Sequence, residues 1–247
     1  MPPYKVLTAG DTGLVVEFGD GVDRQLSAFV LALARRLNEA RLEGITETVP
    51  TFRSLMVYYD PIVLASTALV ARIVELMEGV RTSESAGRLW HLPVCYDCEL
   101  APDLGYVATR TGLTCATVVE RHAAVAYHVY MLGFLPGLAY LGDVPAELAL
   151  PRREVPRTRI PAGSVAIAMS MSCIFPRETP CGLHLIGRSP VALWRQSPGA
   201  EFGALLAPGD RVIFAPISLR EYEDLHAKAA AGKLVITPVD ETRDAAA

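Results

Sequence analysis

Long apolar runs and concentrated charge of one sign are both missing from this chain of 247 residues. Its longest apolar stretch is far shorter than the roughly 20 residues that cross a bilayer. The N-terminal residues MPPYKVLTAGDTG contain no apolar segment of the kind that directs secretion. The formal net charge is -4, and no run of lysine or arginine stands out. We therefore expect a cytoplasmic protein with no membrane and no nucleic-acid partner.

Cysteines are few, with five in the whole chain, and they are scattered. An odd number without an export signal indicates free thiols in a reducing compartment. Cys95 and Cys98 have the spacing of a redox pair or of half a zinc site. Cys115, Cys173 and Cys181 supply no matching second pair, so we expect no metal site.

Several motifs of nucleotide and acyl chemistry are also missing. The chain has no phosphate loop of the Walker type and no Gly-x-Gly-x-x-Gly between a strand and a helix. It has no Gly-x-Ser-x-Gly turn for a serine nucleophile either. With no nucleotide loop and no complete catalytic set, we expect the chain to be inactive alone.

The order ββαββα is what the first 80 residues predict. Glycines separate short β-rich segments, and apolar residues recur at helical spacing between them. The expected strands are 4–8, 14–18, 45–49 and 54–59. The first expected helix is 22–42, with Gly44 as its C-terminal cap. The second begins with a cap at Ser66 or Thr67 and ends at Gly79. This order predicts a small α/β sandwich, residues 1–80, with helices on one face of an antiparallel sheet.

A polar segment, residues 81–88, is the expected linker to a second domain, residues 89–247. Short strands between tight turns predict a closed or sandwiched β structure there. The expected elements are a strand 89–96, helices from Pro102 through Arg110 and from Thr114 to about His122, a core strand 211–217, a helix 220–231, a strand 234–238 and a disordered end, 240–247. The whole chain is therefore assigned to the α+β class.

Gly, Pro and Arg are densest between His122 and Ser189, a pattern of loops with fixed bends, on which function tends to lie. Arginines on such loops hold carboxylates or phosphates, and the alternative is a solvated basic loop. The arginines concerned are Arg152, Arg153, Arg157 and Arg159, and Arg188 could join them.

Other polar residues of this stretch each have a functional and a structural interpretation. Ser164 could be a nucleophile, or its hydroxyl could close a turn. His122 could move a proton near neutral pH, or it could be a core histidine. Tyr140 could wall a small apolar pocket with Phe134, Phe175 and nearby leucines, or belong to the core.

The segment RHAAVAYHVYMLGFLPGLAYLGDVPAELALPRREVPRTRIPAGSVAIA gives the chain a specific resemblance. It resembles the B subunit of bacterial ATP-dependent 5-oxoprolinase. That family is also known as allophanate hydrolase subunit 1 and as a carboxyltransferase subdomain of urea carboxylase-type enzymes, and it includes an inhibitor of a sporulation histidine kinase. The segments GDTGLVVEFGD, VPTFRSLMVYYDP, LPVCY, APDLGYVATRTGL and LIGRSP fit the family in the same order. The likeness covers nearly the whole chain.

The resemblance implies an N-terminal α/β domain and a C-terminal cyclophilin-like β-barrel. It also implies partners like the A and C subunits of 5-oxoprolinase, and ATP as the cofactor of the assembled complex. By the same resemblance, His122 and Ser164 are the candidate catalytic residues, and Tyr140, Arg157, Arg159 and Arg188 are the candidate substrate and anion ligands.

The chain departs from its relatives at one loop. Where they typically read AGGQTGIYP it reads AMSMSCIFP, with Met171 in place of the glutamine, and where they read SPGGW it reads TPCGL, residues 179–183. Side chains in place of glycines change the backbone or fill space that a ligand would use. Two alternatives therefore stay open: a regulatory module that inhibits a histidine kinase, and a subunit for allophanate or urea-type amide hydrolysis or carboxyl transfer.

Overall fold

A computed structural model describes residues 1–81, 87–195 and 203–239. The chain divides into two compact units, Met1–Ala86 and Gly87–Ala247. Most of the predicted linker, residues 82–86, and the predicted disordered end, residues 240–247, lie outside the described residues.

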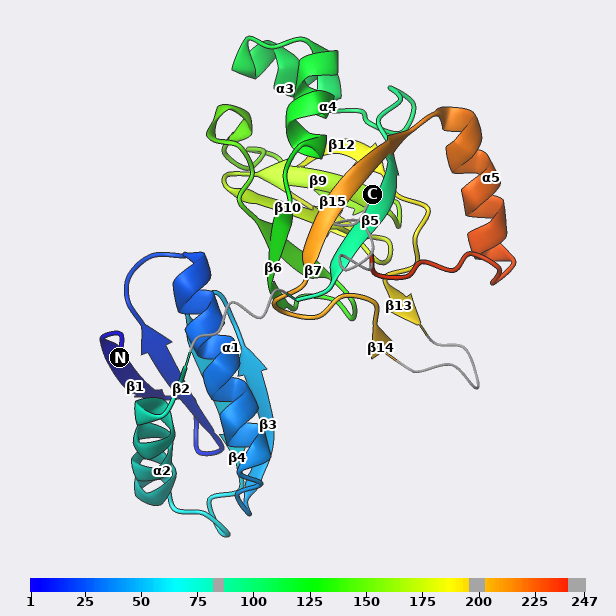
Figure 1. The fold of residues 1–247 in the computed structure, drawn as a ribbon. Helices are drawn as coiled ribbons and strands as arrows, with labels where there is room; N and C mark the ends of the chain where they lie inside the picture. Colours follow the sequence, from blue (N-terminus) through cyan, green and yellow to red (C-terminus); the bar gives the residue numbers. More distant parts are fainter. Residues whose placement is uncertain (82–86, 196–202, 240–247) are drawn as a thin grey trace, which may run out of the picture. The chain divides into compact units, whose positions relative to one another are not determined.

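The first unit has the predicted order of elements (Figure 1). Its elements are β1 (Tyr4–Thr8), β2 (Gly13–Phe18), α1 (Arg24–Glu39), β3 (Ile45–Pro50), β4 (Ser54–Tyr59) and α2 (Ser66–Glu78). The strands form an antiparallel sheet in the order β1-β2-β4-β3.

One face of this sheet carries the core of the first unit. Alternate residues of β2 and β4, such as Leu14, Val16 and Val57, are buried against α1 and α2. Because side chains alternate between the faces of a strand, the same parity on two neighbouring strands makes one apolar surface. The predicted sandwich, with helices on one face, is confirmed.

Two predicted helix ends in this unit were wrong. Helix α1 ends at Glu39, and Arg41 takes the left-handed conformation, φ 45°, that was expected of Gly44. Gly44 instead lies in the connection to β3 with φ 93°, where an added Cβ would approach the Leu64 side chain to 2.8 Å. Helix α2 begins after Ala65, which gives no side-chain cap, so neither Ser66 nor Thr67 caps it.

A closed barrel forms the second unit. Seven strands close in the order β10-β7-β6-β15-β5-β12-β9. The barrel strands are β5 (Leu89–Cys95), β6 (Tyr127–Leu132), β7 (Ala139–Gly142), β9 (Ser164–Ala168), β10 (Met171–Ile174), β12 (His184–Arg188) and β15 (Arg211–Ile217). β5 and β15 run parallel, and the other described neighbours are antiparallel. The predicted α+β class, with a barrel in the second domain, is confirmed.

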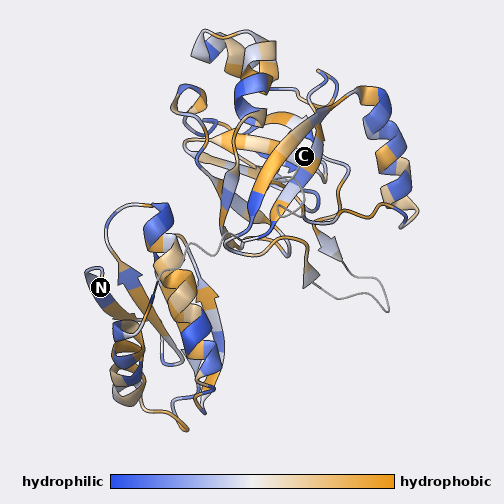
Figure 2. Ribbon diagram, viewed as in Figure 1, coloured by the Kyte–Doolittle hydropathy of each residue, from blue (hydrophilic) through white to orange (hydrophobic). Residues whose placement is uncertain are grey.

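Helices and short ribbons surround the barrel. They are α3 (Leu104–Thr111), α4 (Cys115–Ala123), the single-turn helix Ala146–Leu148, α5 (Leu219–Ala230), the pair β8 (Arg157–Ile160) and β11 (Thr179–Cys181), and the pair β13 (Trp194–Arg195) and β14 (Gly203–Ala204). In Figure 1, α3 and α4 lie together at one end of the barrel. β15 is strongly apolar, as Figure 2 shows, because its alternate residues, such as Val212 and Phe214, fill the barrel core.

The helix starts of this unit refine the predictions. The helix predicted from Thr114 is α4, which begins just after that residue, and Thr114 Oγ1 accepts from the Thr117 amide. Helix α3 begins after Asp103 and not at Pro102, and the Asp103 carboxylate does not cap it but accepts from Arg157. The strand predicted at 234–238 is absent from the described residues; Val239 alone forms an isolated bridge with Leu89.

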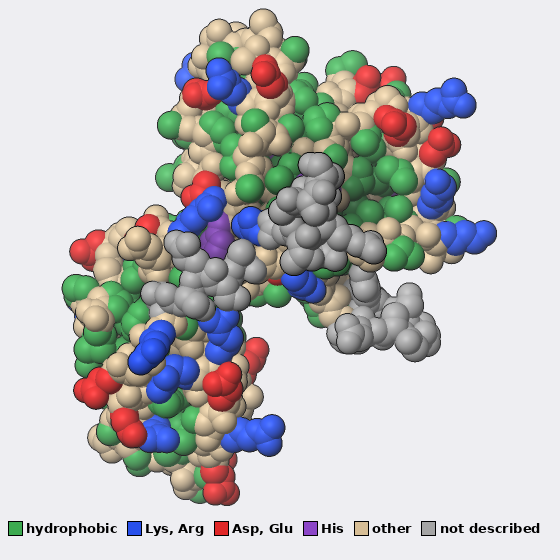
Figure 3. All heavy atoms as spheres, viewed as in Figure 1, with side chains coloured by type: hydrophobic (Ala, Val, Ile, Leu, Met, Phe, Trp, Pro, Cys, Tyr) green, Lys and Arg blue, Asp and Glu red, His purple; other side chains and the backbone are tan. Residues whose placement is uncertain are grey.

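No helix among the described residues is long and apolar enough to span a membrane. In the same residues, no group of three or more His, Cys, Asp or Glu side chains could hold a metal ion. On the face drawn in Figure 3, each of the two units carries both Lys or Arg and Asp or Glu side chains.

Candidate functional site

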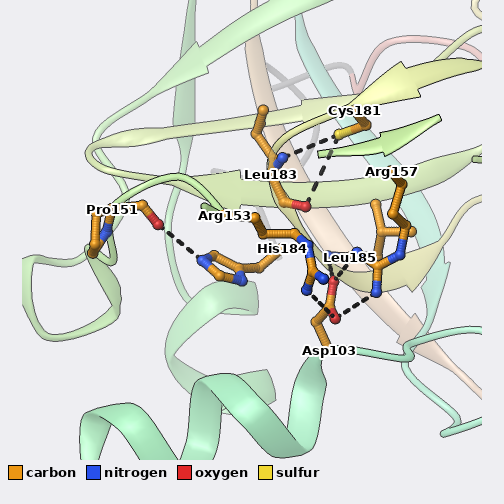
Figure 4. Close-up of polar contacts among 8 residues, drawn as sticks. All are labelled: Asp103, Pro151, Arg153, Arg157, Cys181, Leu183, His184 and Leu185. Carbon is orange, nitrogen blue, oxygen red and sulfur yellow. Dashed lines mark hydrogen bonds and ion pairs between the residues drawn. The ribbon is translucent and has the colours of Figure 1, made fainter. Parts of the chain in front are cut away.

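Asp103 is the centre of an ion-pair cluster on the barrel unit. It precedes α3, and its carboxylate accepts two hydrogen bonds from Arg157, at 2.7 and 2.6 Å, and one from Arg153, at 3.1 Å. The Leu185 amide of β12 donates to the same carboxylate at 2.7 Å. Figure 4 shows both guanidinium groups directed at Asp103 from separate segments. The cluster ties α3, β8 and β12 together.

Asp103 is ionised in this cluster. Burial alone raises the pKa of its carboxyl group, but the Arg157 hydrogen bonds, the Leu185 amide and the charges of Arg157 and Arg153 outweigh burial, so the pKa is lowered. The same hydrogen bonds raise the pKa of Arg157. Both terminal nitrogens of Arg157 donate to this carboxylate, so the anion that Arg157 holds is one of the protein's own.

A cavity of about 360 Å³ opens beside this cluster. Its walls come from α3, from the loop before β8 and from the first residue of β12. The lining residues are Tyr106, Arg110, Leu150, Pro151, Arg152, Arg153, Glu154, Val155 and His184. Three guanidinium groups against one carboxylate make the cavity attractive to an anion. Its volume is at the small end of the range, about 300–1,000 Å³, of ligand pockets.

His184 is the most deeply buried side chain of the cavity wall, with 3% of its surface exposed. Its ring stacks on Tyr106, with centroids 5.3 Å apart. Its Nε2 donates to the Pro151 carbonyl oxygen at 2.9 Å, because a carbonyl can only accept. In Figure 4 the ring lies between Pro151 and the Arg153–Asp103 pair.

The charge of Arg152, in the cavity wall, also acts on a nearby apolar cluster against which Tyr140 packs. Burial raises the pKa values of Tyr140, Cys173 and Cys181. The positive charge of Arg152 opposes this shift in all three groups but is the smaller effect. Tyr140 is half-buried and packs with Leu135 against an apolar cluster that contains Leu138, Phe175, Cys173 and Cys181. Phe134, by contrast, is 68% exposed, so it does not wall this cluster.

His122 lies inside the barrel unit and has no exposed surface. Tyr96 Oη lies 2.8 Å from its Nδ1, and Ser172 Oγ lies 3.1 Å from its Nε2. Its ring stacks on Phe214, with centroids 4.7 Å apart. Burial lowers the pKa of His122 to about 3, so the ring is neutral at pH 7. The acid–base role of His122 stays a prediction, and the geometry is that of a core histidine.

Ser164 and Arg188 are paired in the β9–β12 ladder. Ser164 is 2% exposed, and its Oγ donates to the Pro161 carbonyl oxygen at 2.7 Å, the turn-closing bond of the structural interpretation. Arg188 hydrogen-bonds the hydroxyl of Tyr222 on α5; its charge and bond lower the pKa of that phenol, but burial prevails and raises it. Neither residue lines the cavity. Their proposed roles stay predictions.

Arg159 lies apart from the cavity, with its side chain 75% exposed and its Nε 2.7 Å from Glu178. Of the arginines that the sequence groups together, the structure brings Arg152 and Arg153 to the cavity and gives Arg157 to Asp103. Sequence reasoning missed Arg110 and His184. Their positions in the cavity depend on contacts across the barrel, for which no local sequence pattern exists.

The comparisons with known proteins agree with this architecture. The chain matches the family described as "Carboxyltransferase domain, subdomain C and D" over residues 4–202. It is 35% identical to the B subunit of 5-oxoprolinase from Bacillus subtilis (strain 168), over 89% of this chain and 95% of that protein.

Two solved structures have the same fold. The crystal structure of TTHA0988 is 37% identical, with a TM-score of 0.73 over 84% of this chain, which spans only 40% of that longer chain. The Kluyveromyces lactis urea carboxylase superposes with a TM-score of 0.82 over 96% of this chain and 24% of that one, at 20% identity, which shows the fold alone. The family match covers most of the two-unit chain, so this protein belongs to the family of the carboxyltransferase domain, subdomain C and D.

Proposed function

We propose that this chain is the B subunit of an ATP-dependent 5-oxoprolinase, which opens the lactam ring of 5-oxoproline to give glutamate. The strongest support is the match to the B subunit of the Bacillus subtilis 5-oxoprolinase, because it extends over 95% of that protein. A match of nearly full length favours the same role, as a whole subunit of a complex, over the reuse of a single domain in an unrelated protein. The partners would be proteins like the A and C subunits of that enzyme.

The chemistry requires activation of a stable amide. Transfer of a phosphoryl group from ATP to the lactam oxygen would make the ring carbon reactive toward water. Addition of water, loss of phosphate and cleavage of the C–N bond then give glutamate, ADP and phosphate. This chain would contribute the basic cavity at Arg110, Arg152 and Arg153, which can hold the substrate carboxylate in place during these steps.

The cavity suits a single carboxylate better than it suits ATP. Glu154 adds a negative charge to a wall that a triphosphate would approach with several negative charges of its own. We therefore assign ATP binding to a partner protein, and activity to the assembled complex. The five free thiols suit assembly in the reducing cytoplasm.

The test is to purify this chain alone and together with the A-like and C-like proteins encoded beside it. The expected result is release of glutamate and ADP from 5-oxoproline by the full set and by no smaller set. Turnover of another lactam, of urea or of allophanate, with none of 5-oxoproline, would replace the substrate. Failure of all of these, with inhibition of a sensor histidine kinase, would replace the enzymatic role with a regulatory one.

A further inference from the structure

One face of the sheet in the first unit packs against both helices, and the opposite face carries a row of apolar side chains. The helices α1 and α2 cover the face on which Leu14, Val16 and Val57 form the core. When one face of an antiparallel sheet meets water, the residues on that face are usually polar. The second face of this sheet departs from that pattern.

The apolar row consists of Leu7, Val15, Met56 and Val49, one residue from each strand. In the ladders Leu7 lies opposite Val15, Val15 opposite Met56, and Met56 opposite Val49. Because side chains alternate between the faces of a strand, all four point away from the core. None of them is among the described residues that pack in the core cluster, and Leu7 is 46% exposed. A continuous apolar row outside the core marks an interaction surface.

The row is flanked on both sides by polar residues and one glycine. One side has Lys5, Glu17 and Ser54, and the other has Gly13, Tyr58 and Glu47. An apolar centre with a polar rim is the composition of a protein–protein interface.

The face is small. Four strands about 4.8 Å apart and about 17 Å long span about 300 Å². Standard interfaces bury about 800 Å² on each partner, and smaller ones belong to weak complexes. A partner that uses this face alone is therefore held weakly, and its complex depends on concentration.

We propose that a second copy of this chain covers this face, with a two-fold axis that runs along the apolar row. The two sheets then pack face to face with nearly aligned strands, and each residue of the row meets its equivalent in the other copy. The same axis lays one flank of the row on the other flank. The residues of the two flanks must therefore be complementary, and this condition can be checked.

The flanks of the two central strands meet this condition. Glu17 and Gly13 lie two residues to either side of Val15, so the axis places them opposite each other in the two copies. Gly13 has no side chain and leaves room for that of Glu17. Ser54 and Tyr58 are related in the same way about Met56, and their hydroxyl groups can form a hydrogen bond.

The flanks of the two edge strands carry opposite charges. Lys5, at the start of β1, is placed beside the turn that follows this strand in the other copy and contains Asp11. Glu47, near the start of β3, is placed beside the turn that follows β3 and contains Arg53. In both cases the charges are unlike, and the symmetry forms each pair twice. Complementary charge of this kind favours a second copy as the occupant.

The test is analytical ultracentrifugation of the purified full chain at about 1–200 µM, the range in which a weak dimer forms. The mass should rise from 26.6 kDa toward twice that value. Met56→Lys and Met56→Glu should each weaken association at least about tenfold, because an introduced charge then faces its equivalent across the axis. An equal mixture of the two variants should restore association, because the introduced charges are then opposite.

Ile62→Lys is the matched control. Ile62 is 94% exposed but lies in the turn after β4, outside the row and its flanks, so this change should leave association unaltered. Circular dichroism checks that each variant is folded. If the Met56 variants do not fold, Leu7→Lys and Leu7→Glu repeat the test at the exposed end of the row.

A chain that stays at 26.6 kDa over the whole range would overturn the proposal. So would a mixture of the two charge variants that stays monomeric while the unmodified chain associates, because the row would then not face itself. Binding of the C-like protein by a monomeric chain, lost in Met56→Lys, would assign the face to that partner instead.

Discussion

Arg157 and Asp103 lie 54 positions apart in the chain and form a two-fold hydrogen-bonded ion pair at 2.7 and 2.6 Å. The Asp103 side chain is 5% exposed, and that of Arg157 is 26% exposed. A pair that is this well buried holds the fold of the barrel unit as well as the edge of the cavity. Replacing Arg157 would therefore disturb stability and ligand binding together.

Asp103→Asn should destabilise the barrel unit by about 2–3 kcal/mol, because Arg153 and Arg157 lose their counterion. The effect is smaller than the roughly 3–5 kcal/mol of a fully buried pair, since both arginine side chains are partly exposed. Urea unfolding followed by tryptophan fluorescence measures this, since Trp90 and Trp194 both lie in that unit. The control is Glu178→Gln at the exposed Arg159–Glu178 pair, for which we expect less than about 0.5 kcal/mol. Equal effects of the two substitutions would contradict the assignment.

The stabilising effect of Asp103 should depend on pH. Its folded-state pKa is lowered, so its contribution is complete above the unfolded-state pKa of about 4 and is lost as the pH falls through the folded-state pKa. The difference in unfolding free energy between the unmodified chain and Asp103→Asn should be constant from about pH 7 to 5 and shrink below about pH 4. A difference that grows on acidification would show that the sign is wrong.

Local patterns predicted most of the fold, because helices and strands follow from periodicity and turn residues. The strand predicted at 14–18 and the helix predicted from Thr114 are examples. The errors fell where tertiary contacts decide. Gly44 is placed by its approach to Leu64, and residues 234–238 have strand-forming composition but form no strand, with only Val239 bridging to Leu89.

The candidate site was predicted only in part, for the same reason. The density of arginine and proline indicated an anion site, and Arg152 and Arg153 do line the cavity. Arg157 is not free for a ligand because it pairs with Asp103, and nothing in the sequence around Arg157 predicts that pairing. His122 and Ser164 drew attention as chemically versatile residues, but their burial is visible only in the folded chain.

His122 should make the barrel unit sensitive to acid. Its pKa is about 3 in the folded chain, and an unfolded chain has a histidine pKa of about 6.5, so the unfolded state takes up the proton first. As the pH falls from about 6 to 4, protonation of His122 in the unfolded chain lowers the free energy of unfolding by about 1.4 kcal/mol for each pH unit. His122→Gln, which can still bond Tyr96 and Ser172, should lose this part of the slope. An unchanged slope would mean that the ring is protonated in the fold.

The five thiols should fall into two classes. Cys98 and Cys115 are exposed, while Cys95, Cys173 and Cys181 are buried. Burial raises the pKa of each buried thiol, so little reactive thiolate is present at pH 8. A disulfide reagent should therefore label two thiols of the folded chain quickly and the remaining three only after unfolding. Peptide mapping that found Cys173 among the fast sites would contradict the burial of that strand.

Ser164→Ala distinguishes the turn hydroxyl from the nucleophile. The Oγ hydrogen points to the Pro161 carbonyl, which cannot act as a base, so a structural role predicts loss of about 1 kcal/mol of stability. Turnover by the assembled complex should then stay within about threefold, whereas loss of a covalent nucleophile lowers kcat by about a thousandfold or more.

The matched control is Ser170→Ala, at an exposed serine in the turn between β9 and β10, which should change neither stability nor turnover. A collapse of kcat in Ser164→Ala with an unchanged free energy of unfolding would restore the catalytic assignment. A hydroxyl that only closes a turn should affect the stability of the chain at least as much as its activity.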